Sequence, residues 1–413
     1  MDYKEAMGEN LWIDHSLQLV NAKYLSDLGI EVNNIKPSLL NTLTQASQTA
    51  IHSYREMGGK PPSIDADEQL PLAPSITIST DVSLSKHGNT PFCAGNIREV
   101  IPVNGCQINC LYCLAVSQNR PQTEVQYYDN YSTWFKKQLV INSTDETGFM
   151  YYVSPKTEIM SPETVRNGVA HGIFSVFRDH VLSTEATGKR CKDTMFVVTK
   201  AGVQELLSEL NGESILDIIT AIPDNIQINT SLTPLGNNPS LRKAIEPGAR
   251  SIEDRLKFVD ALQAKNILST GALVEPIIFP YAFDISFYQQ LKQHGIKRVA
   301  LDLLTTSMEN LAVINQVIGW DSKKAEKQMW EAYLFTDASP KNGMRFSVGI
   351  EMQKMLYQKL NQLIKEVGID HAATCKFVEM NTGLRFVTNE EDCGCMAHIS
   401  PNPKSISIER SKF

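Results

Sequence analysis

The stretch IREVIPVNGCQINCLYCLAV occupies residues 97–116 and joins an apolar segment to three closely spaced cysteines. Residues 97–103 are mostly apolar and β-branched, so they are predicted to form a strand. The cysteines that follow are Cys106, Cys110 and Cys113, with the spacing C-x3-C-x2-C. Three thiolates on one short loop can hold three irons of a cubane iron–sulfur cluster and leave the fourth iron open. The stretch therefore predicts a metal-binding loop that follows a strand.

Strand-like and helix-like segments alternate from this point to about residue 305. Several of the strand-like segments are continuous apolar runs, which is typical of strands that are buried on both faces of a parallel sheet. Six β/α units in sequence predict an α/β fold, either a parallel barrel or a doubly wound sheet. Ligands bind at the carboxyl ends of the strands in both. The five later strands are predicted at 148–154, 194–200, 225–231, 270–278 and 297–304.

Helix-start signals follow several of these strands. Ser161 is placed to cap a helix that has Pro162 at its first position. Ser251 and Asp254 form a capping-box pattern at another helix start. A further helix is predicted from about 202 to 219.

Composition limits the class of protein. The chain has 413 residues, 42% of them hydrophobic, and a formal net charge of −7. No run of about 18 apolar residues occurs, so no membrane span is predicted. The N-terminus does not have the pattern of a signal peptide, so we expect a cytoplasmic protein. The mild acidity argues against a broad nucleic-acid surface.

Three regions are predicted. Residues 1–75 are expected to form a helical N-terminal extension and a linker that is rich in Gly, Pro and acidic residues. Residues 90–340 are expected to form the barrel. Residues 341–413 are expected to form a C-terminal extension with a long helix, two short strands and a second group of cysteines.

The cysteine motif, with aromatic Tyr112 directly before Cys113, resembles the signature of the radical S-adenosylmethionine superfamily. The resemblance implies a partial (β/α)6 TIM-like barrel over about residues 95–305, a [4Fe–4S] cluster, and S-adenosylmethionine bound to the open iron. It also implies an electron donor such as flavodoxin or ferredoxin. Reductive cleavage of the cofactor would give a radical that takes a hydrogen atom from the substrate, so the protein would bind and shield the reactants.

Within the superfamily, the sequence is most similar to the spore photoproduct lyase branch. The similar segments are FVVTK at 196–200, NTSL at 229–232, EPG at 246–248, SIEDRL at 251–256 and EP at 275–276. The resemblance implies that Ser154, Lys200 and Ser231 contact the cofactor, and that Tyr112 contacts the adenine through its backbone. The remaining candidates for cofactor binding are Lys156, Glu158, Asn229, Arg255 and Glu275, of which Arg255 could instead pair with an acid.

One feature of that branch is missing. Its hydrogen-donor cysteine follows the second strand, and no cysteine occurs between residues 148 and 165. This departure argues against the same reaction. Cys191 is expected to be a buried small residue rather than a donor.

A second cysteine group consists of Cys375, Cys393 and Cys395. It resembles the auxiliary-cluster extensions of some radical enzymes, so a second iron–sulfur cluster is one interpretation. A zinc site, a redox-active pair and plain thiols are the alternatives. Cys93, His398 or the substrate could supply a fourth ligand.

The first hypothesis is a radical enzyme that acts on a small-molecule or peptide precursor of a natural product, as a lyase, an isomerase or a bond-forming enzyme. The second is repair or modification of nucleic-acid lesions by the same chemistry. The third is a structural zinc protein that uses both cysteine groups. A TIM-barrel enzyme without a cluster would leave the first cysteine group unexplained.

Overall fold

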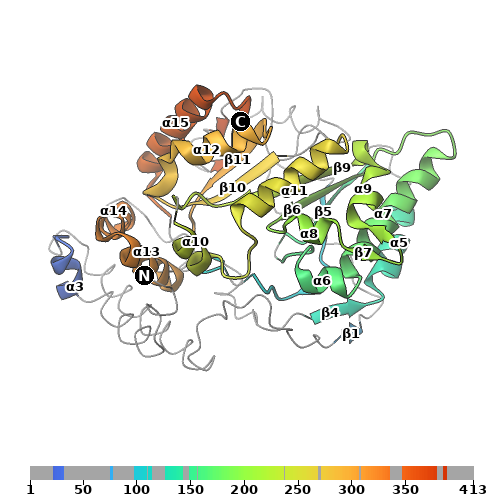
Figure 1. Ribbon diagram of the computed structural model, residues 1–413, viewed down its shortest axis with the longest axis horizontal. Coiled ribbons are helices and arrows are strands. Elements are labelled where there is room, and N and C mark those ends of the chain that lie inside the picture. The colour runs from blue at the N-terminus through green and yellow to red at the C-terminus, as the bar shows by residue number, and fades with distance from the viewer. Residues whose placement is uncertain are drawn as a thin grey trace.

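The structure is a computed structural model (Figure 1). It describes residues 22–31, 75–77, 97–108, 110–113, 126–142, 148–155, 157–236, 238–267, 271–306, 308–334, 347–378 and 385–387. Of the predicted N-terminal helical region, it describes mainly helix α3 (Ala22–Asp27). The three-region division of the chain stays a prediction.

A parallel sheet forms the centre of the molecule. Its strand order is β13-β12-β11-β10-β9-β6-β5-β2, and only the pairing of β12 with β13 is antiparallel. The six predicted strands form β2, β5, β6, β9, β10 and β11 in chain order, so the predicted α/β fold with a partial TIM-like barrel is confirmed. The strands are β2 (Ile97–Val100), β5 (Met150–Val153), β6 (Thr194–Thr199), β9 (Ile226–Leu232), β10 (Gly271–Ile277), β11 (Arg298–Leu303), β12 (His371–Val378) and β13 (Arg385–Val387).

The first predicted strand is shorter than expected. It ends at Val100, and Val103–Asn104 instead forms β3 of a small separate sheet with β4 (Gln126–Asp129) and β1 (Ser75–Thr77). Pro102 lies between the two pieces and has no N–H to donate to a ladder, which accounts for the break.

Helices connect and cover the strands. Helices α5, α7 and α9 pack in a row, and α12 packs against α15 (Figure 1). The helices are α5 (Tyr131–Asn142), α6 (Pro162–Arg166), α7 (Val169–Glu185), α8 (Val203–Leu206), α9 (Ile215–Thr220), α10 (Pro239–Ile245), α11 (Ile252–Ala264), α12 (Ile285–Gln293), α13 (Met308–Asp321), α14 (Lys323–Leu334) and α15 (Ile350–Val367). Within the described residues, no helix combines the length and apolar character that a membrane crossing requires.

The predicted helix starts are confirmed. The Ser161 side chain accepts a hydrogen bond from the backbone N–H of Thr164, and the Ser251 side chain accepts one from Asp254. The single helix predicted at 202–219 is wrong, because a two-stranded hairpin separates α8 from α9. Asn211 and Gly212 form its turn with φ angles of 55° and 82°, and Asn-Gly favours this turn.

Apolar side chains fill the space between sheet and helices. One core cluster lies under β10, β11 and helices α11–α15, and the second lies under β5, β6 and helices α5–α9. All seven residues of β9 are buried, which matches a strand covered on both faces. This buried scaffold fixes the strand ends that carry the polar side chains described next.

Candidate active site

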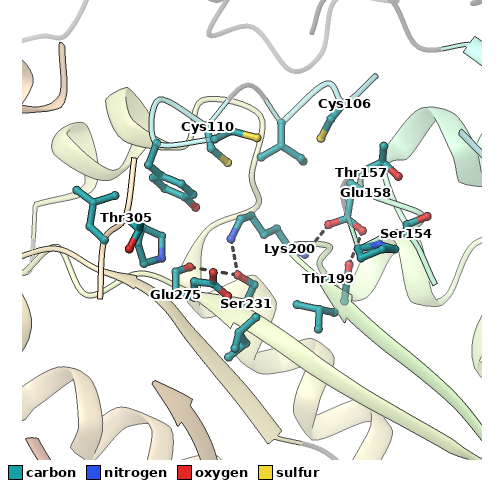
Figure 2. A pocket seen from close by; sticks show the side chains of 18 of the residues that line it. Cys106, Cys110, Ser154, Thr157, Glu158, Thr199, Lys200, Ser231, Glu275 and Thr305 are labelled. Atoms are coloured by element: carbon teal, nitrogen blue, oxygen red, sulfur yellow. Dashed lines mark hydrogen bonds between the residues drawn. The ribbon is translucent and has the colours of Figure 1, made fainter. Parts of the chain in front are cut away.

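A cavity of about 380 Å³ lies at the carboxyl ends of the parallel strands (Figure 2). The three cysteines of the loop contribute to its lining, and so do residues from the ends of β5, β6, β9, β10 and β11. These segments are far apart in the sequence, and the sheet brings them to one edge as predicted. The lining includes Cys106, Cys110, Cys113, Tyr112, Tyr152, Ser154, Thr157, Glu158, Lys200, Ser231, Leu273, Glu275, Leu303 and Leu304.

The cysteine loop is tied to the barrel through its backbone. The N–H of Leu111 donates to the carbonyl of Ile245 over 3.0 Å, and the N–H of Gly248 donates to the carbonyl of Ile108 over 2.9 Å. On the other side, the Asn310 amide donates to the carbonyl of Cys113 over 3.2 Å. These bonds hold the loop over the cavity, and Figure 2 shows Cys106 and Cys110 at its rim.

Without a metal, the protein environment disfavours the thiolate form of Cys106 and Cys110. Burial raises the pKa of Cys106 to about 12, and it also raises the pKa of Cys110 well above the ordinary value for a thiol. Cys113 adds to both effects by charge repulsion, whereas Lys200 opposes them. A bound metal centre reverses this preference because it takes thiolates as ligands and neutralises their charge. The donor set, three thiols that line one cavity, therefore fits an iron–sulfur cluster with one open iron.

A buried carboxylate, Glu246, connects the loop to the barrel. Its Oε1 accepts hydrogen bonds from the Tyr112 hydroxyl and, over 3.0 Å, from the Thr233 hydroxyl. Its Oε2 accepts one from Arg255 over 2.8 Å, and the Lys200 ammonium lies 3.3 Å from Oε1. Burial raises the pKa of Glu246, but the charges of Arg255 and Lys200 outweigh it and hold that pKa below its ordinary value. The carboxylate therefore stays ionised at the centre of this network.

Lys200 extends from the end of β6 into the middle of the cavity (Figure 2). Its ammonium donates a hydrogen bond to the hydroxyl of Ser231 and lies 5.6 Å from the ring centroid of Tyr112. An ammonium held this way can pair with a carboxylate that enters the cavity. Both Lys200 and Ser231 thus lie where the sequence predicted them.

Ser154 has two unusual features. Its φ of 51° is uncommon for a residue other than glycine, and its buried hydroxyl has no hydrogen-bond partner among the described residues. The N–H of Ser154 donates to the carbonyl of Val100 over 2.8 Å, which fixes this conformation. An unsatisfied hydroxyl beside a cavity is a group that a ligand can complete.

We expect Ser154→Ala to raise the free energy of unfolding of the ligand-free protein by about 1 kcal/mol, because it removes a buried polar group without a partner. The same variant is expected to bind S-adenosylmethionine more weakly. Chemical denaturation and equilibrium dialysis measure the two effects. A less stable variant with unchanged cofactor affinity would show that the hydroxyl has a structural partner instead.

Glu158 is oriented by the protein itself. Its carboxylate accepts hydrogen bonds from the Thr199 hydroxyl and the N–H of Lys200, each over 2.7 Å, and from the N–H of Met160 over 3.0 Å. Burial raises its pKa, and these hydrogen bonds oppose the shift. The residue connects the loop after β5 to the end of β6, and its role toward a cofactor stays a prediction.

The other predicted cofactor residues lie at different depths. Glu275 lines the cavity and precedes a cis peptide bond to Pro276. Arg255 is fully buried and forms an ion pair with Glu246. Of its two predicted roles, this is the pairing with an acid. Asn229 is buried inside the barrel, where its Oδ1 accepts a hydrogen bond from Gln227 over 3.2 Å. Lys156 lies outside the described residues.

The second cysteine group is largely outside the described residues as well. The backbone of Cys375 belongs to β12, whereas Cys393 and Cys395 are not among the residues that the structure describes. The predicted auxiliary cluster and its alternatives therefore stay predictions.

Sequence reasoning missed the contacts of Glu246 and Gly248 with the cysteine loop. Both occur in the EPG segment, which was noted only as part of a family resemblance. A Cβ on Gly248 would lie 2.4 Å from the carbonyl oxygen of Gln107 and 2.7 Å from the Cα of Ile108. Only glycine therefore allows the segment to pack against the cysteine loop.

We expect Gly248→Ala to displace the loop and to lower the iron content of the reconstituted protein severalfold, because the clashing atoms belong to backbone. Gly188→Ala is the control, since Gly188 has φ of 79° and open space around its Cβ position. It should lower stability by about 1–2 kcal/mol but keep the iron. Equal iron content in both variants would contradict the packing argument.

Comparisons with known proteins are consistent with this architecture. No protein-family model matches the sequence, and no curated protein matches it. Among solved structures, the chain is similar to a doubly substituted spore photoproduct lyase with bound AdoMet (S-adenosylmethionine) and dinucleoside spore photoproduct. The TM-score is 0.51, and the sequence identity is 14% over 83% of this chain and 97% of that chain. A tyrosine-to-phenylalanine variant of spore photoproduct lyase gives a TM-score of 0.51 and 13% identity over 81% of this chain and 95% of that chain. At 13–14% identity the similarity establishes the fold alone. It confirms, for the fold, the resemblance to the spore photoproduct lyase branch.

Proposed function

We propose that the chain is a radical S-adenosylmethionine enzyme. The observation that carries the proposal is the convergence of Cys106, Cys110 and Cys113 with Lys200 and Ser154 on one cavity at the carboxyl ends of the strands. The similar fold of a protein solved with bound AdoMet supports it. When bound, the cluster and the cofactor would together supply a 5′-deoxyadenosyl radical by one-electron reduction of the sulfonium.

The residues of the chain would bind and orient the reactants. Cys106, Cys110 and Cys113 would hold the cluster. The Lys200 ammonium would pair with the cofactor carboxylate, while the hydroxyls of Ser154 and Ser231 would serve its amino group and ribose. Glu246 would fix the position of the Lys200 side chain relative to the cysteine loop, since it contacts Lys200 and Tyr112.

Apolar side chains would shield the radical from water. Tyr152 on β5, Leu273 on β10, and Leu303 and Leu304 at the end of β11 line the cavity beside the polar groups. Exclusion of water prevents side reactions of reactive intermediates. This lining is compatible with abstraction of a hydrogen atom from carbon.

For the substrate we propose a nucleoside-containing molecule, such as a nucleic-acid lesion. The dinucleoside bound by the similar structure supports this class, although the acidic composition argues against a broad nucleic-acid surface. The missing cysteine between residues 148 and 165 argues that the hydrogen returned to the product comes from a different donor than in the lyase branch.

A small molecule or peptide is the second candidate substrate. Two observations favour it: the net charge of −7, and Lys200 as the one lysine or arginine among the described residues that line the cavity. A phosphate backbone normally meets several lysines and arginines. A natural-product precursor has no support from the comparisons.

The test is anaerobic incubation of the reconstituted protein with S-adenosylmethionine and dithionite, with 5′-deoxyadenosine as the measured product. We expect slow formation without substrate and faster formation with ultraviolet-irradiated DNA or its dinucleotides. No 5′-deoxyadenosine under any condition would reject the radical enzyme. Formation that irradiated DNA does not accelerate would reject the nucleic-acid substrate and favour the small molecule.

A further inference from the structure

A second group of metal-ligating side chains lies at the opposite end of the sheet from the cavity. His180 belongs to helix α7, and Cys191 and Asp193 belong to the segment that leads into β6. One ligand atom from each of the three residues lies within 4.8 Å of the other two. Asp193 directly precedes β6 and Lys200 directly follows it, so the length of a strand separates this group from the cavity.

The group is buried and held from several sides. Cys191 and Asp193 are each 5% exposed, and the His180 side chain is 9% exposed. Asp193 Oδ1 accepts a hydrogen bond from the N–H of Phe149 over 2.7 Å. The Asn225 amide donates to the carbonyls of Cys191 and Asp193 over 3.2 and 2.7 Å. The backbone around both ligands is therefore fixed without a contribution from a metal.

We propose that His180, Cys191 and Asp193 form a zinc site. A thiolate, a neutral imidazole and a carboxylate are all ligands that Zn²⁺ takes. Their charges sum to −2, so a bound Zn²⁺ gives a neutral group, which suits a buried position. With three protein ligands, the fourth position of a tetrahedral site would be left to a water molecule.

The competing interpretation is a buried ion pair with a neighbouring thiol. His180 Nε2 and Asp193 Oδ2 are 2.7 Å apart, which is a hydrogen-bond distance. Ligand atoms of a tetrahedral zinc lie about 3.3 Å apart. Zinc binding therefore requires the histidine and the carboxylate to separate by roughly half an ångström and the histidine to lose its proton.

The proposed role of the site is structural. It would join helix α7 to the amino ends of β5 and β6, since Asp193 already bonds to Phe149 just before β5. The metal would thus fix one edge of the barrel while the catalytic cavity lies at the other. The proposal does not depend on the proposed function of the cavity.

The test compares zinc bound per chain in the full-length wild type and three variants, after incubation with zinc sulfate and removal of excess metal. His180→Gln and Cys191→Ser each remove a ligand. His171→Gln is the matched control, because His171 is a second buried histidine of α7 that contacts the carbonyl of Ser208 over 2.9 Å. We expect the first two variants to bind about one zinc fewer per chain than the wild type, and the control to bind as much as the wild type.

Cobalt is the second probe. Co²⁺ bound in place of zinc should give a thiolate charge-transfer absorption that is weaker in Cys191→Ser than in His171→Gln. His180→Gln keeps an amide that can hydrogen-bond to Asp193, so it is the variant most suited to fold. If folded His180→Gln binds as much zinc as the wild type, the group is an ion pair and the zinc site is overturned. The same conclusion follows if all four proteins bind no zinc.

Discussion

Glu246→Ala is expected to lower the free energy of unfolding by about 3–5 kcal/mol, which is the usual cost of removing one partner from a buried ion pair. Arg255 is fully buried, and its guanidinium would keep its charge without a carboxylate to balance it. Tyr112 and Thr233 would lose their common acceptor as well. Urea denaturation followed by circular dichroism measures the loss.

Glu205→Ala is the matched control. Glu205 pairs with Arg250, whose side chain is 30% exposed and can turn to water. We therefore expect a smaller loss of unfolding free energy, about 1–3 kcal/mol. Most of it should come from the buried N–H of Gly202, which would lose the Glu205 carboxylate as its hydrogen-bond acceptor. If both variants lose the same stability, the buried charge on Arg255 is not the cause.

The acid side of the stability curve gives a further check on Glu246. Its pKa in the folded protein is below the ordinary 4.5, so its contribution is complete above that pH and is lost as the pH falls further. Glu246→Gln has no such group. Its stability is expected to depend less on pH below 4.5 than that of the wild type.

Cys110→Ala is expected to abolish reductive cleavage of S-adenosylmethionine while the barrel stays folded. Cys110 is buried and lines the cavity, and its backbone carbonyl accepts a local hydrogen bond from the N–H of Cys113, which a side-chain substitution leaves in place. Loss of one thiolate removes one of the three protein ligands of the cluster, whereas a buried cysteine replaced by alanine costs the fold little. The readouts are 5′-deoxyadenosine for cleavage and circular dichroism for the fold.

Loss of 5′-deoxyadenosine with an unchanged spectrum is the result that the cluster assignment requires. Full cleavage by Cys110→Ala would show that the cluster has other ligands. A misfolded variant would show that the loop supports the barrel, and Cys113→Ala, at a partly exposed position, would then repeat the test.

The architecture was predictable because its signals are local. Several of the six strands are short apolar runs, and Ser161 and Ser251 mark helix starts within three residues of their bonding partners. The helix predicted at 202–219 is interrupted at Asn211-Gly212, a local turn signal that predicts the observed hairpin.

The site was predictable only in part. Cys110, Lys200 and Ser231 follow or end strands, so parallel topology alone brings them to one edge. Glu246 lies between two helices, and its partners Tyr112 and Arg255 come from segments 134 and 9 residues away. A long-range network of this kind leaves no periodic or spacing signal in a single sequence.

The most direct test of the account is the iron and acid-labile sulfide content after anaerobic reconstitution, in the wild type and in the triple variant with alanine at Cys106, Cys110 and Cys113. We predict that the variant holds about four irons and four sulfides fewer per chain than the wild type. Iron that remains in the variant would then belong to the second cysteine group. Equal iron in both proteins, or zinc in place of iron in the wild type, would contradict the central claim that this loop holds a [4Fe–4S] cluster.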